Sequence, residues 1–301
     1  MSATPGKVLI SGSSGLVGSA LLPRLAAIGW QVTRLIRSSP SAPGQVSWDP
    51  RRTISPDSVS GFDAVIHLAG ETIAERWTER NRQAIRDSRV LGTRNIAEAL
   101  AQAAKRPALL VAASAIGYYG DRGDEVLNEE SSGGAGFLAE VCREWEAATQ
   151  VAAQAGIRTV LARFGIVLSR SGGALGKMLT PFRLGLGGRV GSGAQWWSWV
   201  ALDDVVGAIE HVMKTEALAG PVNVVSPSPV TNREFTRTLA SALSRPAFFP
   251  MPELAARLAL GQMADELLLA SQRVEPARLR SSGYRFRRPE LGNALAAILA
   301  K

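Results

Sequence analysis

Three glycines near the N-terminus have the spacing that a bound pyrophosphate requires. Gly12, Gly15 and Gly18 follow a short apolar run, Val8–Ile10, and lead directly into an apolar helical pattern. In a strand–turn–helix unit the first glycine permits a tight turn, the second keeps a Cβ away from the phosphates, and the third lets the helix approach the strand. The free N–H groups and positive dipole end of the helix then face the anion. The sequence therefore predicts a dinucleotide site built from Gly12, Ser13, Ser14, Gly15, Leu16, Val17 and Gly18.

A second feature discriminates between dinucleotides. NAD-selective sites place Asp or Glu on the ribose hydroxyls about 20 residues beyond the glycines. Here the second apolar run ends at Ile36 and is followed by Arg37 and Ser38, with no carboxylate. A guanidinium offers a charged fork to a 2′-phosphate, and the serine adds a hydroxyl. We therefore expect the cofactor to be NADP, with NADPH as its reduced form.

The elements that must position these residues alternate along the first half of the chain. Short apolar runs separated by helical patterns indicate parallel strands with right-handed crossovers, and hence an α/β, doubly wound, Rossmann-like sheet. Ligands of such sheets bind at the carboxyl ends of the strands. The expected strands are Val8–Ile10, Val32–Ile36, Ala64–Leu68, Leu109–Ala113 and Thr159–Phe164, and the expected helices are Leu16–Ile28, Arg80–Ala104 and Phe137–Gln154.

The second half of the chain is less regular and predicts a smaller C-terminal α+β substrate lobe. We expect residues 1–170 to form the NADP-binding domain, with later returns to the sheet within 200–226. Residues 171–247 would supply elements of the substrate lobe, and 248–301 a helical C-terminal domain. Expected elements are a helix near Asp203, a strand at Val222–Val225, a helix opened by the capping box Thr231–Glu234, and helices at Glu253–Leu260 and Glu266–Gln272.

A glycine-rich segment of this half carries the candidates for substrate binding. Lys177 and Arg183, with Trp196, Trp197 and Trp199, could form a basic pocket with an aromatic wall, suited to a planar or phosphorylated ligand. Tryptophans beside a helix start are usually part of a core, so packing is favoured over the pocket for these residues, Trp197 included. Asp203-Asp204 resembles a metal pair, but we favour a cap of the helix following Leu202, and we expect Glu129-Glu130 to form an exposed acidic turn.

Composition excludes several classes of function. The 301 residues are 46% hydrophobic and 20% charged, with a net charge of +8 whose arginines are interleaved with acidic residues. Nucleic-acid binders concentrate their basic residues in a stripe, and membrane spans need about 18 apolar residues, so we expect neither partner. Two histidines and one cysteine, Cys142, leave no zinc cluster and no internal disulfide, which favours a cytoplasmic location.

Further motifs extend over nearly the whole chain. They are SGSSGLVG (Ser11–Gly18), DAVIHLAGE (Asp63–Glu71), SRVLGTRN (Ser88–Asn95), ASAIGYYG (Ala113–Gly120), RFGIVL (Arg163–Leu168), GGALGKML (Gly172–Leu179), PVNVVSP (Pro221–Pro227), SQRVEPARL (Ser271–Leu279) and GYRFRRPE (Gly283–Glu290). With these motifs the chain resembles the extended and atypical short-chain dehydrogenase/reductases, which include the NAD-dependent epimerases and dehydratases. It is most similar to an "epimerase family" subgroup with a C-terminal domain of unknown function.

The resemblance implies roles for residues at the ends of the later strands. His67 belongs to the pattern, with packing favoured over acid–base work. Arg89 stands where the family's N-x-x-G-T element has asparagine. The serine that hydrogen-bonds in the family corresponds to Ser114. The cofactor-contacting residues implied in this way are Leu68, Ala69, Gly70, Glu71, Arg89, Ser114 and Val167.

The family's Tyr-x-x-x-Lys pair is missing from this chain. In the family the two side chains face the same way on the helix after the serine, and the ammonium helps the tyrosine to exchange a proton near neutrality. None of the tyrosines at 118, 119 and 284 is followed by lysine four residues on. Matching Glu146 to the family's downstream glutamate puts the positions of the pair on Leu138 and Cys142, and a shift of one residue puts them on Phe137 and Val141.

Three interpretations therefore stay open. In the first, the chain is an oxidoreductase or epimerase of a small molecule that uses a displaced acid–base group. Tyr118, which follows Ser114 on the same loop, is the leading substitute, and Glu71 and Lys177 are next. For Tyr118 itself, a packed or cofactor-contacting side chain is favoured over catalysis. Alternatively, it transfers hydride while substrate or solvent supplies the proton, at a cost of ~10²–10⁴-fold in rate. The third interpretation is a regulatory sensor of NADP(H) occupancy; some relatives carry a cell-division label, which these residues do not independently support.

Overall fold

The computed structural model describes residues 6–300, and the chain divides into two compact units. Unit 1 comprises the residues up to Ser114 together with 141–162 and 209–222. Unit 2 comprises 115–140, 163–208 and the residues from Asn223 onward. Each unit is thus assembled from segments that are distant in the sequence.

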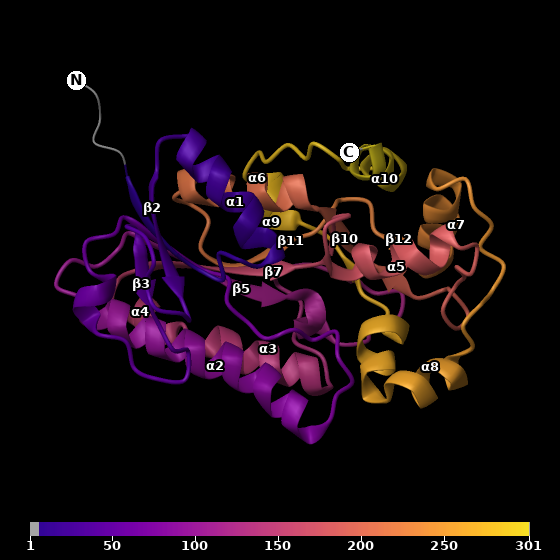
Figure 1. The fold of residues 1–301 in the computed structure, drawn as a ribbon, viewed down its shortest axis with the longest axis horizontal. Coiled ribbons are helices and arrows are strands. Elements are labelled where there is room, and N and C mark those ends of the chain that lie inside the picture. The colour runs from indigo at the N-terminus through magenta and orange to yellow at the C-terminus, as the bar shows by residue number, and fades with distance from the viewer. Residues whose placement is uncertain (1–5, 301) are drawn as a thin grey trace. The chain divides into compact units, whose positions relative to one another are not determined.

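A seven-stranded sheet runs through unit 1 in the order β11-β7-β5-β4-β1-β2-β3 (Figure 1). Strand β1 lies between β2 and β4 and is parallel to both, so that Ile10 is opposite Arg34 on one side and Ile66 on the other. The predicted doubly wound α/β class is confirmed. The strands are β1 (Lys7–Ser11), β2 (Gln31–Ile36), β3 (Gln45–Ser47), β4 (Ala64–His67), β5 (Leu109–Ala115), β7 (Arg158–Phe164) and β11 (Gly220–Val224).

Helices α1 and α2 lie on opposite sides of these strands (Figure 1). Leu9, Val65 and Leu110 of the strands and Ile96 and Leu100 of α2 form the core between the sheet and α2, and each is at most 3% exposed. The helical and 3₁₀ elements wholly or partly in unit 1 are α1 (Leu16–Ala27), η1 (Pro56–Val59), α2 (Glu79–Gln102), α3 (Phe137–Ala147), α4 (Gln150–Gln154) and α6 (Leu202–Lys214).

The predicted helix over 137–154 is divided into α3 and α4. At the break, the Thr149 hydroxyl donates to the Glu146 carbonyl at 2.7 Å. A threonine side chain that bonds the preceding turn in this way competes with the backbone ladder. The break therefore has a local cause that the apolar pattern did not indicate.

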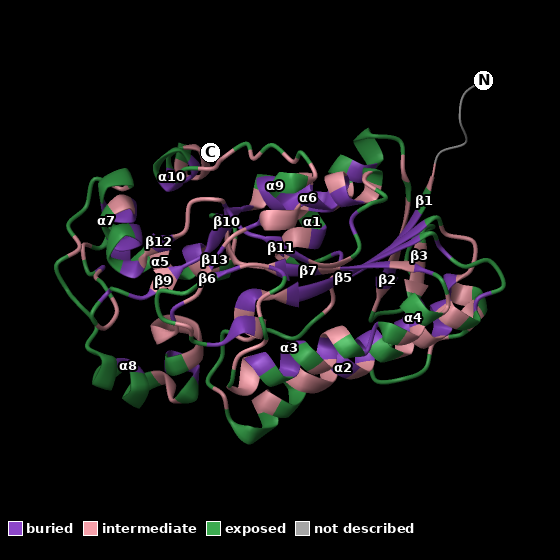
Figure 2. Cartoon of the chain, turned by 180° about the vertical axis from the view of Figure 1, so that it is seen from behind, coloured by how far each residue is buried: buried purple, intermediate pink, exposed green. Residues whose placement is uncertain are grey.

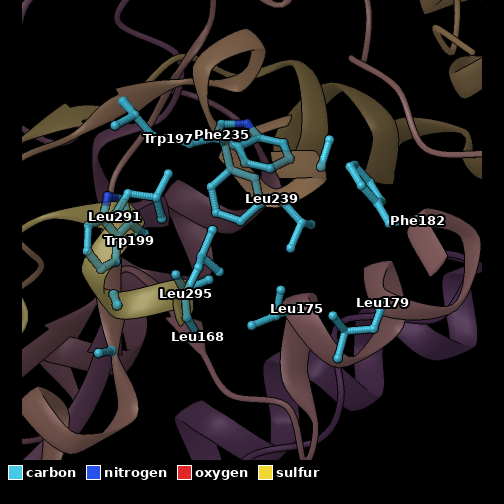
Figure 3. Packing of buried hydrophobic residues seen from close by; sticks show 14 residues of the cluster. Leu168, Leu175, Leu179, Phe182, Trp197, Trp199, Phe235, Leu239, Leu291 and Leu295 are labelled. Atoms are coloured by element: carbon cyan, nitrogen blue, oxygen red, sulfur yellow. The ribbon is translucent and has the colours of Figure 1, made fainter. Parts of the chain in front are cut away.

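Unit 2 is built from short strands and helices around a core of its own. Figure 3 shows this core, in which Trp197 and Phe235 lie beside one another, with ring centroids 5.3 Å apart. The elements are η2 (Ile116–Tyr119), β6 (Val126–Leu127), β8 (Ile166–Leu168), α5 (Gly173–Arg183), β9 (Trp196–Trp197), β10 (Trp199–Ala201), β12 (Val230–Thr231), α7 (Asn232–Ala242), α8 (Glu253–Leu260), η3 (Ala264–Leu269), β13 (Arg273–Val274), α9 (Ala277–Ser281) and α10 (Leu291–Ala300).

Two acidic residues of unit 2 have roles other than those expected. Glu129 does not lie in an exposed turn: it is 6% exposed and accepts hydrogen bonds from the N–H groups of Asn223 and Arg278. Asp204 lies inside the first turn of α6 rather than at its cap, and accepts from the N–H groups of Arg287 and Arg288. Both carboxylates anchor backbone that is distant in the sequence, which local patterns do not reveal.

Among residues 6–300, no helix is both long and apolar enough to cross a membrane. The same part of the chain contains no group of three or more His, Cys, Asp or Glu side chains placed to hold a metal ion.

Candidate functional site

The start of α1 is open to an anion. Within residues 6–300, no side chain caps this helix, and its first turn carries no acidic residue. By contrast, Thr78 caps α2 by accepting from the Asn81 N–H, and Thr231 caps α7 in the same way. The N–H groups in the first turn of α1 therefore stay available as hydrogen-bond donors, at the positive end of the helix dipole.

The three glycines of the turn are required for different reasons. Gly12 has φ +68°, and a Cβ there would lie 2.6 Å from the Leu68 carbonyl. A Cβ on Gly18 would lie 2.7 Å from the Ser13 Cα. The chain's own backbone therefore excludes a side chain at both positions.

Gly15 is different, because nothing in the fold demands a glycine there. Its φ of −73° and ψ of 174° suit any residue, and a Cβ would contact only the Gly12 oxygen, at 3.3 Å. The missing side chain therefore leaves open space in front of the helix. A pyrophosphate cradle requires this space, so residues 12–18 fit a dinucleotide.

Arg34 supports the turn and was not among the predicted site residues. Its Nε donates to the Ser13 hydroxyl at 3.0 Å, and Ser13 is buried whereas Ser14 is exposed. Arg34 reaches the turn because β2 lies beside β1 in parallel register. The sequence signal that could have identified Arg34 was its position as a charged residue inside an apolar strand pattern.

Arg37 follows β2 with its guanidinium available. Its side chain is 78% exposed and, within residues 6–300, has a single carboxylate within ion-pairing range, Glu71, at 3.9 Å between Nη1 and Oε2. A pair this long and this exposed contributes ~0–1 kcal/mol. Ser38 beside it is also exposed. Arg37 can therefore exchange Glu71 for a better anion at little cost.

The segment after β4 contacts the glycine turn on its other side. Leu68 and Ala69 approach Gly12 closely, and Gly70 follows them at the surface. Since β1 lies between β2 and β4, Arg37 and Glu71 leave the sheet from the strands on either side of the glycine turn.

Arg89 reaches this edge from α2. Its Nη1 donates to the carbonyls of Glu71 and Ile85, at 3.0 and 3.2 Å, and its guanidinium lies 5.1 Å from the Trp145 ring centroid. Burial lowers the pKa of this guanidinium, against the opposing charges of Cys142 and Glu71. Arg89 thus holds the Gly70–Glu71 backbone in place.

His67 is a packed residue, as the sequence favoured. It is fully buried, its Nδ1 lies 2.6 Å from the Ser11 hydroxyl, and its Nε2 lies 3.0 Å from the Thr93 hydroxyl. Trp145 Nε1 also donates to Thr93. Burial lowers the pKa of His67 to about 4, so the ring is neutral at neutral pH and links β1, β4 and α2.

Ser114 has a carboxylate partner. Its hydroxyl, buried at the end of β5, donates to Glu146 Oε1 of α3 at 2.7 Å. A serine that gives its proton to a carboxylate presents its oxygen lone pairs to other donors. Glu146 was not among the predicted site residues, although its match to the family's downstream glutamate was a signal.

The helix that should carry the Tyr-x-x-x-Lys pair presents neither tyrosine nor lysine at the expected positions. Leu138 is partly buried, and Cys142 is 3% exposed. The alternative positions are Phe137 and Val141, and Val141 is 1% exposed. The one titratable side chain at these four positions is therefore the buried thiol of Cys142.

Tyr118 follows β5 in η2 of unit 2. The guanidinium carbon of Arg163 lies 3.5 Å from its ring centroid, and Tyr119 packs edge-on at 5.4 Å. No group in the described residues hydrogen-bonds the Tyr118 hydroxyl. Its ring is therefore fixed while its hydroxyl stays available.

The neighbouring Tyr119 is instead fully engaged. Its hydroxyl donates to Asn223 Oδ1 at 2.8 Å and accepts from Arg163 at 3.0 Å. Burial raises the pKa of Tyr119, although Arg163 and Asn223 act in the opposite direction. Tyr119 is thus a structural residue that orients Arg163.

The remaining candidates are Trp197, Lys177, Arg183 and Val167, and within residues 6–300 they do not form a single cluster. Trp197 is 4% exposed and belongs to the unit 2 core, which is the packing alternative. Lys177 and Arg183 are exposed on α5, and six residues place them about 120° apart around the helix. Val167 lies on β8 and pairs with Val200 of β10.

Comparison with known proteins places this geometry in a family. Residues 8–225 match the NAD dependent epimerase/dehydratase family, and residues 251–298 match a domain of unknown function, DUF1731. An "Epimerase family protein" of Mycobacterium bovis is 44% identical over 290 residues, covering 96% of each chain.

Two solved structures are also similar. Human epimerase family protein SDR39U1, crystallised with NADPH, has a TM-score of 0.90 and 36% identity, covering 98% of this chain and 99% of that one. A nucleoside-diphosphate sugar epimerase from Corynebacterium glutamicum has a TM-score of 0.83 and 40% identity, with 98% of this chain but 58% of that chain covered. The chain belongs to the NAD dependent epimerase/dehydratase family, in the epimerase-family branch that carries the DUF1731 domain.

Proposed function

We propose that this protein binds NADPH and exchanges hydride with a small carbonyl or alcohol substrate, as an oxidoreductase or epimerase. The observation that carries the proposal is the open start of α1, where Gly15 leaves space that the fold itself does not use. The NADPH in the structure of human SDR39U1 supports the choice of cofactor.

Different residues at this edge of the sheet would bind different parts of the cofactor. The first-turn N–H groups of α1 would bind the pyrophosphate, and Arg37 with Ser38 would bind the 2′-phosphate. The segment 68–71 would line the opposite wall, held by Arg89. A bound NADPH supplies a hydride to an electrophilic carbon.

Reduction of a carbonyl also needs a proton at the substrate oxygen, and we assign it to Tyr118. Arg163 and Tyr119 hold the Tyr118 ring, and the hydroxyl is not committed to another group of the described chain. Arg163 places a positive charge on the ring face of Tyr118. This charge would take the role that the lysine has beside the family's tyrosine. Tyr118 gives up its hydroxyl proton in the reductive direction and accepts one in the oxidative direction.

Ser114 orients the substrate in this scheme. Because its own proton goes to Glu146, its oxygen is left to accept a hydrogen bond from a substrate hydroxyl. The pair Ser114–Glu146 is also the most direct route for a proton if Tyr118 proves dispensable.

The test of hydride transfer uses labelled cofactor. Purified protein is incubated with stereospecifically deuterated NADPH and a metabolite extract, and loss of deuterium from the cofactor is followed by mass spectrometry. Transfer that depends on the protein and on one face of the nicotinamide supports the enzyme. Persistent absence of transfer contradicts a net oxidoreductase; an epimerase returns the hydride to its substrate, and its test is exchange of deuterium between a labelled substrate and the cofactor.

A regulatory function is the alternative, and it is favoured by the absence of tyrosine and lysine at the expected positions of α3. In that case NADPH titration quenches tryptophan fluorescence and changes hydrogen-exchange protection elsewhere in the chain, while no deuteride is transferred. We propose a cytoplasmic location in either case, with which the single cysteine and the absence of a spanning helix in residues 6–300 are compatible.

A further inference from the structure

Unit 2 carries an unusual exposed surface far from the glycine turn in sequence. Of the nine large apolar side chains that are exposed among the described residues, seven lie in two segments, 184–186 and 248–258. We call this set the apolar face. It consists of Leu184, Leu186, Phe248, Phe249, Met251, Leu254 and Leu258.

Backbone contacts bring the two segments together. The Phe249 N–H donates to the Gly187 carbonyl at 3.2 Å, and the Met251 N–H donates to the Arg189 carbonyl at 2.8 Å. Gly191 in turn donates to the Met251 carbonyl at 2.9 Å. The chain after α5 therefore runs beside the chain that leads into α8.

The side chains of the apolar face protrude. Phe248 is 82% exposed, Leu258 72%, Leu184 69% and Leu254 68%. Leu254 and Leu258 are one turn apart on α8, which Figure 2 shows as a largely exposed helix. Residues that line a groove are covered on their flanks, so these exposures describe a projecting surface rather than a groove.

Prolines make the projecting loop stiff. Pro246, Pro250 and Pro252 flank the two phenylalanines, and each fixes its own φ near −65°. The Gly185 position lies against Pro246, since a Cβ there would be 3.5 Å from the proline Cγ. The loop is therefore presented with little conformational entropy left to lose on binding.

The charge around the apolar face is positive. The segments 183–191 and 244–260 contain four arginines and one glutamate, Glu253. Glu253 and Asp265 pair with Arg257, whereas Arg183 and Arg245 have no carboxylate within ion-pairing distance in residues 6–300. Unpaired arginines next to protruding apolar side chains complement a partner that has an anionic surface and an apolar interior.

We propose that the apolar face docks onto an anionic lipid surface, with the phenylalanines and leucines entering the headgroup region and the arginines contacting lipid phosphates. An interfacial segment of this kind buries its apolar side ~5–10 Å deep and gains affinity from each cation. The sequence prediction of no membrane partner considered spanning segments, and the two halves of this face are about 60 residues apart in the sequence.

A second copy of the chain suits the face less well. An isologous contact would bring two copies of the same positively charged face together, and like charges at an interface are unfavourable. The overall charge of +8 adds to that repulsion. Charge complementarity therefore favours the lipid over the dimer.

The test is vesicle co-sedimentation of the full chain. We expect binding to vesicles of phosphatidylcholine mixed with phosphatidylglycerol, little binding to phosphatidylcholine alone, and weakening by added salt. The variant F248S/F249S and the variant R183S/R245S should each reduce partitioning by ~10-fold or more. The matched controls, Ile28→Ser and Arg80→Ser on unit 1, should bind as the unchanged protein does, and circular dichroism establishes that each variant is folded.

Three results would overturn the proposal. The first is absence of binding to anionic vesicles, and the second is equal binding by the F248S/F249S variant. The third is a dimer in sedimentation velocity that this variant dissociates, since that result assigns the face to a second copy. None of these results bears on NADPH binding, so the proposed function is tested separately.

Discussion

The glycine turn of unit 1 and the tyrosine pair of unit 2 are built in opposite ways. The turn is made of backbone within residues 12–18, and its key property is a missing side chain. The environment of Tyr118 is made of side chains from distant segments, because Arg163 lies 45 residues further along the chain. A backbone site is encoded locally, whereas the proposed proton-transfer site is assembled by the fold. The comparison explains why the cofactor could be inferred more fully than the reaction.

Removing the Tyr118 hydroxyl is expected to have the largest effect. Tyr118→Phe keeps the stacking on Arg163 and loses the proton donor, so the rate of deuteride transfer should fall ~10²–10⁴-fold. The neighbouring Tyr119→Phe is the control. It should lower the free energy of unfolding by ~1–2 kcal/mol through its lost hydrogen bonds, with a much smaller change in rate for the folded protein. An unchanged rate in Tyr118→Phe would transfer the assignment to Ser114 and Glu146.

The protein should lose stability in acid because of His67, which contacts Ser11 and Thr93 behind the glycine turn. His67 has a pKa of about 4 when folded against 6.5 as its ordinary value, so the unfolded chain binds the proton first as pH falls. Its contribution is fully present above pH 6.5 and is lost between pH 6.5 and about 4, amounting to roughly 3 kcal/mol. Urea unfolding across this range measures the loss. His67→Gln should flatten the pH dependence, and an unchanged slope would show that another group is responsible.

Reversing the charge at Arg37 sharpens the comparison on the cofactor side. Arg37→Asp should weaken NADPH binding by ~1.5–3 kcal/mol and leave NADH nearly unaffected, because only NADPH carries the 2′-phosphate. Tryptophan quenching gives both affinities. Arg52→Asp, a similarly exposed arginine with a weak acidic neighbour, is the matched control and should change neither affinity. Equal affinities of the unchanged protein for NADPH and NADH would refute the role of Arg37.

The smallest expected effect separates two glycines of the same turn. Gly15→Ala should weaken NADPH binding about tenfold while changing the free energy of unfolding by less than ~1 kcal/mol, since its φ suits alanine and only the Gly12 oxygen, 3.3 Å from the added Cβ, has to give way. Gly12→Ala should instead destabilise the fold, because its φ is +68° and Leu68 occupies the space. Thermal melts together with NADPH titrations distinguish the two. Normal binding by Gly15→Ala would mean that the open space is not the pyrophosphate cradle.

Much of unit 1 could be predicted because its signals are local. The apolar runs that predicted β1, β2, β4, β5 and β7 lie within one or two residues of the observed strands, since buried parallel strands consist of continuous apolar residues. The missing Tyr-x-x-x-Lys pair was visible by simple inspection. Arg34 and Glu146 were missed, because their partners Ser13 and Ser114 are reached only across the sheet or from a neighbouring helix.

The sequence by itself determined the family, the strand–turn–helix unit and the three glycines, because turn geometry and strand burial depend on neighbouring residues. Only the tertiary structure decided that Gly15 faces open space, that Glu129 is buried, that Arg163 lies on the Tyr118 ring and that two apolar segments form one exposed face. The physical reason is that contacts between distant residues depend on strand order and packing, which no local pattern specifies.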